Sequence, residues 1–168
     1  MAFRFALLGF LFVLPLLVRP AAVWAGPSDA TPPPTLAELE LQLLDLTNTD
    51  RTRSGLAPVE PDATMLEVAR ARAAAQLVTN GLSHYDPDGT IAMVSLLAEA
   101  GVSYQLAGEN LARDAGLYGG IAETVEGALL QSPAHRRNIL HPAFTRVAIG
   151  AAVDPAGRVA LAEIFRAL

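Results

Sequence analysis

Apolar residues recur at helical spacing over residues 36–46. One apolar stripe, which predicts a helix over residues 35–54, is made by Leu36, Leu39, Leu43 and Leu46. Thr35 and Glu38 have the spacing of a capping box at the start of this helix, and Gly55 is expected to end it. Asn48 and Arg51 lie one turn apart near its end, where they either face solvent or hold the loop that follows.

Two further helices are predicted before the first strand. Asp62 is a suitable cap for a helix over residues 62–80, whose buried stripe comprises Leu66, Ala69, Ala73 and Leu77. The small side chains of this stripe imply close packing against another layer, and we expect Arg70 and Arg72 to face solvent. Residues 82–89 form a loop because of their proline and glycine content. A third helix, capped by Asp88 or Thr90, ends near residue 101.

The next segment combines a predicted strand with a fourth helix. Residues 102–112 are expected to be extended, with Glu109 between Gly108 and Asn110 in an otherwise apolar stretch. A glycine inside a strand often marks a place where another group approaches the backbone closely. In the helix predicted over residues 121–130, the residues expected to face inward are Ile121, Val125, Ala128 and Leu129. Glu123 and Glu126 lie off that stripe, so we expect both to be solvated.

A hairpin closes the chain. Apolar side chains alternate cleanly along residues 147–153, and a second strand is expected over residues 158–165. Residues 154–157, with the sequence Asp-Pro-Ala-Gly, form the turn, and Phe165 is the expected last core residue. Helices gathered around one small, mostly antiparallel sheet indicate an α+β fold. Neither an internal repeat nor a second domain is visible.

Composition and charge exclude several classes of function. The formal net charge is −5, and all 12 basic residues are arginines. A lysine-free, acidic chain argues against nucleic acid and against anionic membrane surfaces, because both require clustered cations. Cysteine is absent, which excludes disulfides, thiol catalysis and zinc sites built on thiolates.

The first 25 residues have the pattern of an export signal. Arg4 provides the positive start, an apolar run follows over residues 5–18, and Ala25 suits cleavage before Gly26. The run is shorter than the roughly 18 apolar residues of a membrane span, and Pro15 interrupts it. We therefore expect a secreted or periplasmic protein with no stable membrane anchor after cleavage. Residues 26–34 form a proline-rich linker, and residues 35–168 form the folded domain.

Most of the chemically active side chains near the end of the chain lie in residues 132–140. Ser132 can cap a short helix, and Pro133 suits its first turn because its missing N–H is not needed there. His135 would then lie on a stiff turn rather than on a loose loop. The other notable polar residues, His84 and Glu109, are far upstream, so only folding can assemble a site.

Five blocks in order resemble one family. These blocks are residues 48–58 (Asn-x-x-Arg-x-x-x-Gly-Leu-x-Pro), 83–89 (Ser-His-x-Asp-Pro-Asp-Gly), 100–104 (Ala-Gly-Val-Ser-Tyr), 108–112 (Gly-Glu-Asn-Leu-Ala) and 132–140 (Ser-Pro-x-His-Arg-x-Asn-Ile-Leu). Together they resemble the CAP superfamily, also called SCP-like, and within it the short, cysteine-free, bacterial secreted branch. The resemblance covers nearly all of residues 39–165.

The resemblance implies a fold and a set of site residues. The fold is a three-layer α-β-α sandwich, with a cleft lined by His84, Glu109 and His135, beside which Ser132 and Asn110 lie. Some members of the family bind a divalent cation such as Zn²⁺ through the histidines, here His84 and His135. Others bind sterols or fatty acids in apolar grooves. The second cleft glutamate of the family pattern has no counterpart, because Ser132 falls near where it would align.

Several functions are compatible with these residues. The main hypothesis is a binding or interaction module whose ligand is a lipid, a peptide or a component of the cell envelope, with or without a metal at the histidines. An alternative is a lipid- or sterol-binding protein that uses an apolar groove. A hydrolase with Ser132 or Ser83 as nucleophile is less favoured, because the chain lacks a Gly-x-Ser-x-Gly elbow. A purely structural role is also open, in which Glu109 accepts hydrogen bonds from His135 or from backbone N–H groups.

Overall fold

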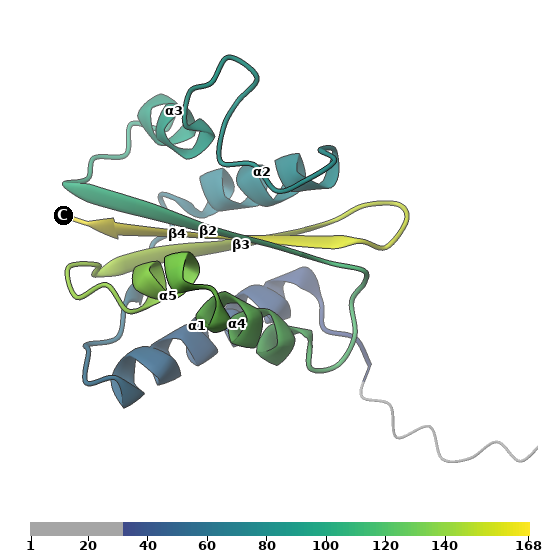
Figure 1. Ribbon diagram of the computed structural model, residues 1–168, viewed down its shortest axis with the longest axis horizontal. Coiled ribbons are helices and arrows are strands. Elements are labelled where there is room, and N and C mark those ends of the chain that lie inside the picture. The colour runs from purple at the N-terminus through teal and green to yellow at the C-terminus, as the bar shows by residue number, and fades with distance from the viewer. Residues whose placement is uncertain (1–31) are drawn as a thin grey trace, which may run out of the picture.

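Residues 32–168, which the computed structural model describes, form three layers with a sheet in the middle (Figure 1). The predicted export signal and residues 26–31 of the linker lie outside this part. The elements follow one another as α1 (Leu36–Arg53), β1 (Glu60–Pro61), α2 (Leu66–Leu77), α3 (Ala92–Glu99), β2 (Leu106–Asp114), α4 (Ile121–Gln131), α5 (Pro133–Ile139), β3 (Arg146–Val153) and β4 (Val159–Ala167). Within residues 32–168, no helix has both the length and the apolar character that crossing a membrane requires.

The sheet has the strand order β1-β3-β4-β2. Strand β4 pairs antiparallel with β3 in the predicted hairpin, and it also pairs antiparallel with β2, a pairing that the sequence did not specify. The two-residue strand β1, which the sequence did not reveal, runs parallel to the start of β3. Strand β2 is therefore one outer edge of the sheet. On the opposite edge, the Ala151 N–H of β3 donates to the Glu40 carboxylate at 3.0 Å, which satisfies a backbone group that has no strand beside it.

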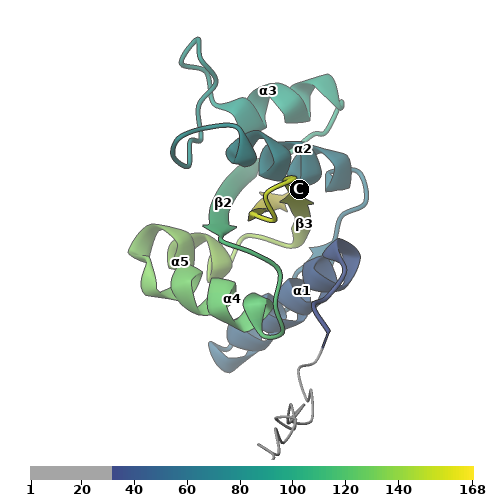
Figure 2. The ribbon, with the colours of Figure 1, turned by 90° about the vertical axis from the view of Figure 1, so that its right-hand side faces the viewer.

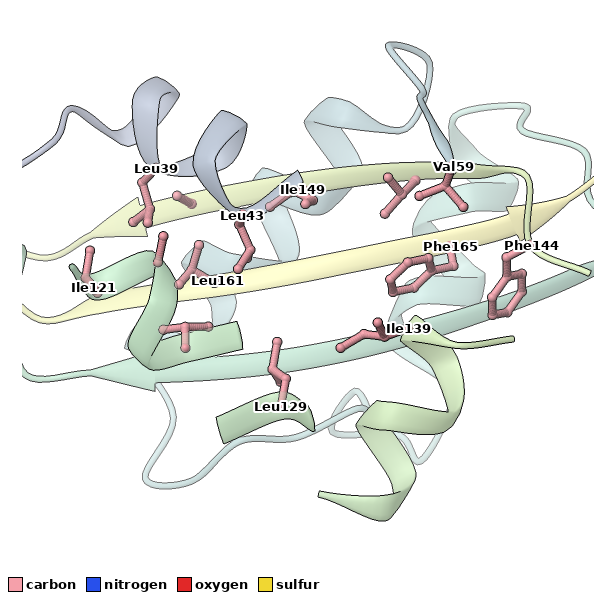
Figure 3. Packing of buried hydrophobic residues seen from close by; sticks show 14 of the residues in the cluster. Leu39, Leu43, Val59, Ile121, Leu129, Ile139, Phe144, Ile149, Leu161 and Phe165 are labelled. Carbon is pink, nitrogen blue, oxygen red and sulfur yellow. The ribbon is translucent and has the colours of Figure 1, made fainter. Parts of the chain in front are cut away.

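Helices cover both faces of the sheet, so the predicted α-β-α sandwich is confirmed. Helices α1, α4 and α5 lie on one face, and α2 and α3 lie on the other (Figures 1 and 2). The larger core fills the first of these interfaces, where leucines of α1 meet α4, α5 and the sheet (Figure 3). Phe165, the expected last core residue, is fully buried and stacks on Phe144 with ring centroids 5.5 Å apart.

Helix α2 packs against the sheet with almost no space between the two backbones. Ala69 and Ala73 of its alanine-rich stripe are fully buried. A Cβ atom built on Gly150 of β3 would lie 2.2 Å from the carbonyl carbon of Ala69, so only glycine fits there. The close packing predicted from the small side chains of this helix is therefore confirmed.

Three local predictions can be compared directly. The capping box of α1 is present, because the Glu38 N–H donates to Thr35 Oγ1 at 3.2 Å and the Thr35 N–H donates to Glu38 Oε2 at 2.7 Å. Helix α2 is shorter than predicted, and Asp62 does not cap it. The Asp62 carboxylate instead accepts from Thr64 and, at 2.7 Å, from Arg166 of β4. Ala128, predicted to face inward, is exposed.

The C-terminal part of α1 holds two loops, the one that follows this helix and the one between α5 and β3. The Asn48 amide exchanges two hydrogen bonds with the backbone of Val59, at 2.8 and 3.0 Å. The buried Arg51 guanidinium donates to four backbone carbonyls, those of Ala57, Ile139, His141 and Phe144. The prediction that these two side chains hold the following loop is confirmed, and Arg51 also fixes the connection between α5 and β3.

Candidate functional site

A buried carboxylate on the outer strand β2 is the centre of the site. Glu109 has a side chain that is 3% exposed, and it forms a bidentate pair with Arg72 of α2, whose side chain is 4% exposed. Arg72 Nε donates to Oε1 at 2.7 Å and Nη2 donates to Oε2 at 3.2 Å. The prediction that Arg72 faces solvent was wrong. Its partner is distant in the sequence, so helical periodicity alone could not reveal the pair.

His84 is the second member of the site, and the loop after α2 presents it. Its Nδ1 lies 2.7 Å from Glu109 Oε2. The preceding residue, Ser83, is held by both Arg72, which donates to its carbonyl at 2.7 Å, and Gln76, which accepts its N–H at 2.9 Å. Because an ion-paired carboxylate is an acceptor, Nδ1 carries the proton, and the Nε2 lone pair of His84 is directed away from Glu109.

His135 comes from the opposite layer, on the short helix α5. This helix begins at Pro133 as predicted, but Ser132 occupies the N-cap without the expected side-chain hydrogen bond. Within residues 32–168, His135 Nδ1 is a buried polar atom without a hydrogen-bond partner. Burial lowers the pKa of His135, and protonation of His84 would lower it further. A pKa below the ordinary value of 6.5 keeps the His135 ring mostly neutral at pH 7.

The expected hydrogen bond between Glu109 and His135 does not form, because Arg72 and His84 occupy the carboxylate. Instead, α5 is attached to β2 through two amides. The Asn110 amide donates to the His135 carbonyl at 3.3 Å. Asn138 donates both to Asn110 Oδ1 at 2.9 Å and to the Glu109 carbonyl at 3.2 Å.

Gly108 allows this attachment. A Cβ atom at this position would lie 3.0 Å from Asn138 Oδ1 and 3.0 Å from the Phe144 ring. The interpretation that glycine in this strand marks a close approach is confirmed.

The site therefore bridges the two helical layers across the outer edge of the sheet. Figure 2 shows the loop between α2 and α3 above the β2 edge and helix α5 below it. We refer to His84, Glu109 and His135 as the histidine cluster. The structure brings His84 into contact with Glu109 and attaches the backbone of His135 to the adjacent residue Asn110, while Ser132 lies at the start of α5.

Two buried acids were missed by the sequence reasoning. Glu126 of α4, predicted to be solvated, is 2% exposed, and Glu163 of β4 is 1% exposed. Thr47 of α1 lies between them, with its hydroxyl 3.1 Å from Glu163 and 3.4 Å from Glu126. Glu163 stands within an apolar strand, and that position was the available signal that it is buried. Glu126 carries no such signal, because its neighbours along the chain are compatible with an exposed helix face.

The histidine cluster has the donors of an incomplete metal site. The imidazole nitrogens of His84 and His135 are suitable ligands for a zinc-like cation. Glu109 accepts a hydrogen bond from Nδ1 of His84, as carboxylates that orient metal-binding histidines do. However, no group of three or more potential ligands occurs within the described part of the chain. Any cation would therefore need further donors from water or from a ligand.

Comparison with known proteins agrees with this architecture. The sequence profile of the CAP family, described as the cysteine-rich secretory protein family, matches residues 44–165. YkwD of Bacillus subtilis is 30% identical over 131 residues, which is 78% of this chain and 49% of YkwD. YlbC of the same organism, described as a membrane protein, is 34% identical over 134 residues, or 80% of this chain and 36% of YlbC. The chain thus spans half or less of these curated relatives.

Solved structures show the same fold. An extracellular protein of Bacillus anthracis that contains an SCP domain superposes with a TM-score of 0.66 and 29% identity, over 82% of this chain and 45% of that one. An outer surface protein of Borrelia burgdorferi has a TM-score of 0.66 at 19% identity, over 81% of this chain and 97% of that one. The second likeness concerns the fold alone.

Proposed function

Because this chain belongs to the CAP, or cysteine-rich secretory protein, family, we propose that it is an exported binding module that holds its ligand at the histidine cluster. Two observations favour export: the signal-like residues 1–25, and the similarity to an extracellular protein of Bacillus anthracis. The proposal of binding rather than catalysis rests on the geometry of Glu109.

The single observation that carries the proposal is that both oxygens of Glu109 are already bound. Arg72 and His84 occupy the carboxylate at 2.7 Å each. A carboxylate whose two oxygens already bond an arginine and an imidazole is poorly placed as a general base, because a substrate proton would have to displace one of these partners. Glu109 therefore orients His84 and leaves the Nε2 atom of that ring as the group that meets a ligand.

A hydrolytic role finds little support in the serines near the histidines. The Ser83 hydroxyl donates to the Tyr85 carbonyl at 3.1 Å rather than to an imidazole. Ser132 starts α5, and it lies on the helix that carries His135 rather than opposite that ring. Neither arrangement matches a serine whose proton is taken by a histidine.

The donors favour a weak two-histidine metal site as part of the binding surface. His84 Nε2 and the His135 ring would hold the ion, and a divalent cation bound there would act as a Lewis acid that attracts an anionic or carbonyl group of the ligand. The lowered pKa of His135 keeps this imidazole unprotonated as the pH falls below neutrality.

Zinc titration of the purified exported protein, prepared without chelators, tests the proposal. We expect His84→Ala and His135→Ala each to weaken zinc binding at least about tenfold, since each removes one of two protein ligands. The matched control is His141→Ala, because His141 is the third histidine of the chain, its ring packs at a tilt against Phe144, and its Nδ1 accepts from the Ala143 N–H at 3.2 Å. Zinc affinities equal to wild type in both cluster variants would refute the metal proposal.

A second candidate function uses an apolar groove. A space of about 390 Å³ lies between α1 and α2 beside the open edge of β3, and it is lined by Ala37, Leu41, Leu44, Ala63, Leu66 and Val147, among others. The volume and the apolar lining suit an acyl chain. The Arg70–Glu40 ion pair, at 2.7 Å, lines the same groove and offers a charged group for a polar headgroup.

Native mass spectrometry of the exported protein tests this candidate. A co-purified lipid should be lost from Leu41→Glu, which places a charge in the groove, and retained in the control Val78→Glu, because Val78 is 86% exposed and lies outside the groove. It should also be retained in His84→Ala. Organic extraction that yields no lipid from the wild-type protein would count against the groove.

A further inference from the structure

The buried acids Glu126 and Glu163 have a connection to the histidine cluster. Neither carboxylate forms a salt bridge within residues 32–168, and the Thr47 hydroxyl lies between them. That hydroxyl has one proton to donate, and the Asn110 amide provides one further donor, at 2.9 Å from Glu163 Oε2. Four carboxyl oxygens therefore share two neutral donors, which is far too little to hold two buried negative charges.

This donor count requires the two acids to retain a proton between them. Burial, and then the charges of Glu163 and Asp50, raise the pKa of Glu126. Burial also raises the pKa of Glu163 to about 7, against the opposing effect of its hydrogen bonds from Asn110 and Thr47. Glu163 accepts from both donors, whereas Glu126 is reached only by the Thr47 hydroxyl at 3.4 Å, so Glu163 is the acid of the pair that ionises first.

Two amides connect Glu163 with the cluster. Asn110 donates to Glu163 Oε2 on one side and to the His135 carbonyl on the other, at 2.9 and 3.3 Å. The oxygen of the same amide accepts from Asn138, which also donates to the Glu109 carbonyl. A change in the charge of Glu163 therefore acts on the amide that supports the backbone of His135.

We propose that Glu163 is a positioning residue of the histidine cluster, and that its ionisation changes how firmly Asn110 holds His135. An ionised Glu163 is a strong acceptor that fixes the Asn110 amide, whereas a protonated Glu163 is a weaker acceptor and releases it in part. Glu163 is faced by Thr47 of α1, by Glu126 of α4 and by Asn110 of β2, and through Asn110 it is connected to His135 and Asn138 of α5. The charge of Asp50 of α1 acts on Glu126. This inference deepens the proposed function and rests on it for its biological role.

Nuclear magnetic resonance of the full folded chain without ligand tests the inference. In the wild-type protein, the Asn110 side-chain signals and the His135 backbone amide signal should show an inflection near pH 7, the value expected for Glu163. Glu163→Gln, which keeps the shape but cannot ionise, should abolish that inflection. The exposed residue Glu123, on the same helix as Glu126, provides the control variant Glu123→Gln, which should leave it unchanged.

Thr47→Val provides a second route if Glu163→Gln does not fold. Valine keeps the shape of threonine but removes a donor to Glu163, so the inflection should move upward by about half a pH unit or more. An inflection that persists unchanged in either variant would overturn the inference. Because no ligand is present, this outcome is separate from the zinc titration: failure to bind zinc would refute the proposed function and leave the coupling between Glu163 and His135 intact.

Discussion

Replacing Glu126 by glutamine should stabilise the protein, and the gain should grow with pH. In the folded chain Glu126 keeps its proton because burial and the charge of Glu163 raise its pKa from 4.5 to about 9. In the unfolded chain it ionises at an ordinary value, so between these two pKa values the folded state binds one more proton than the unfolded state. The stabilisation contributed by protonated Glu126 is therefore complete at low pH, and it is lost as the pH rises from the unfolded to the folded pKa of this group.

The magnitude follows from the same window. Each pH unit above 4.5 costs the wild-type protein at most about 1.4 kcal/mol through this one group, or about 3 kcal/mol at pH 7. Glutamine has the shape of the protonated acid and does not ionise, so Glu126→Gln does not incur this loss. The effect of Glu163 is shared by both proteins and cancels in the difference between them.

Urea unfolding at several pH values between 5 and 8.5 measures this difference. The free energy of unfolding of Glu126→Gln should exceed that of the wild-type protein by an amount that rises steadily with pH. Glu123→Gln, an exposed change in the same helix, should follow the pH dependence of the wild-type protein. A difference between Glu126→Gln and wild type that stays constant across this pH range would refute the reasoning.

Three further predictions concern the site and the sheet. Arg72→Leu leaves the Glu109 carboxylate buried without its cation, and it should lower the free energy of unfolding measured in urea by about 3–5 kcal/mol. The exposed control Arg136→Ala should change that free energy by less than about 0.5 kcal/mol, and equal effects of the two variants would contradict the buried ion pair. Gly150→Ala places a Cβ atom 2.2 Å from the α2 backbone and should destabilise the fold by about 1–3 kcal/mol or more. The control Gly127→Ala, which adds a Cβ in open space on α4, should stabilise the fold by about 0.5–1 kcal/mol. A thermal-shift measurement in which both variants gain stability would show that α2 and the sheet are not in close contact. The His135 ring should titrate below its ordinary value of 6.5 by NMR, and a midpoint at or above 6.5 would contradict its burial beside a second imidazole.

Two features that depend on neighbours along the chain were predicted correctly, whereas the side-chain caps expected from Asp62 and Ser132 do not form. The capping box of Thr35 and Glu38 and the turn at residues 154–157 are formed by residues within four positions of one another. Apolar periodicity located α1, α2, α4 and β3, because one face of each element has to leave water. The positions of α3 and α5 were instead predicted from loop, cap and proline signals. The two-residue strand β1 carries too few side chains to show any period, and for that reason it was missed.

The resemblance of the sequence to a family identified the residues of the histidine cluster. It did not identify the residue that pairs with Glu109, which is Arg72. Arg72 and Glu126 both lie on helices at positions that alone suit a solvated charge. Their surroundings come from residues 37 positions away in each case, Glu109 for Arg72 and Glu163 for Glu126. The pattern of the chain could not distinguish these charges from exposed ones such as Glu123.

Local chemistry thus specified the elements, their order and the layered α+β class, because helix caps, turns and apolar stripes act over a few residues. The electrostatic character of the site depended on the packing of the layers. Only the folded chain shows that Arg72 and His84 share Glu109 and that Asn110 attaches the backbone of His135 to the same strand. It also shows that Glu126 and Glu163 lie together in the core without a salt bridge to any residue of 32–168. The energy of a buried charge is set by the groups around it, and the fold brings those groups from distant parts of the sequence.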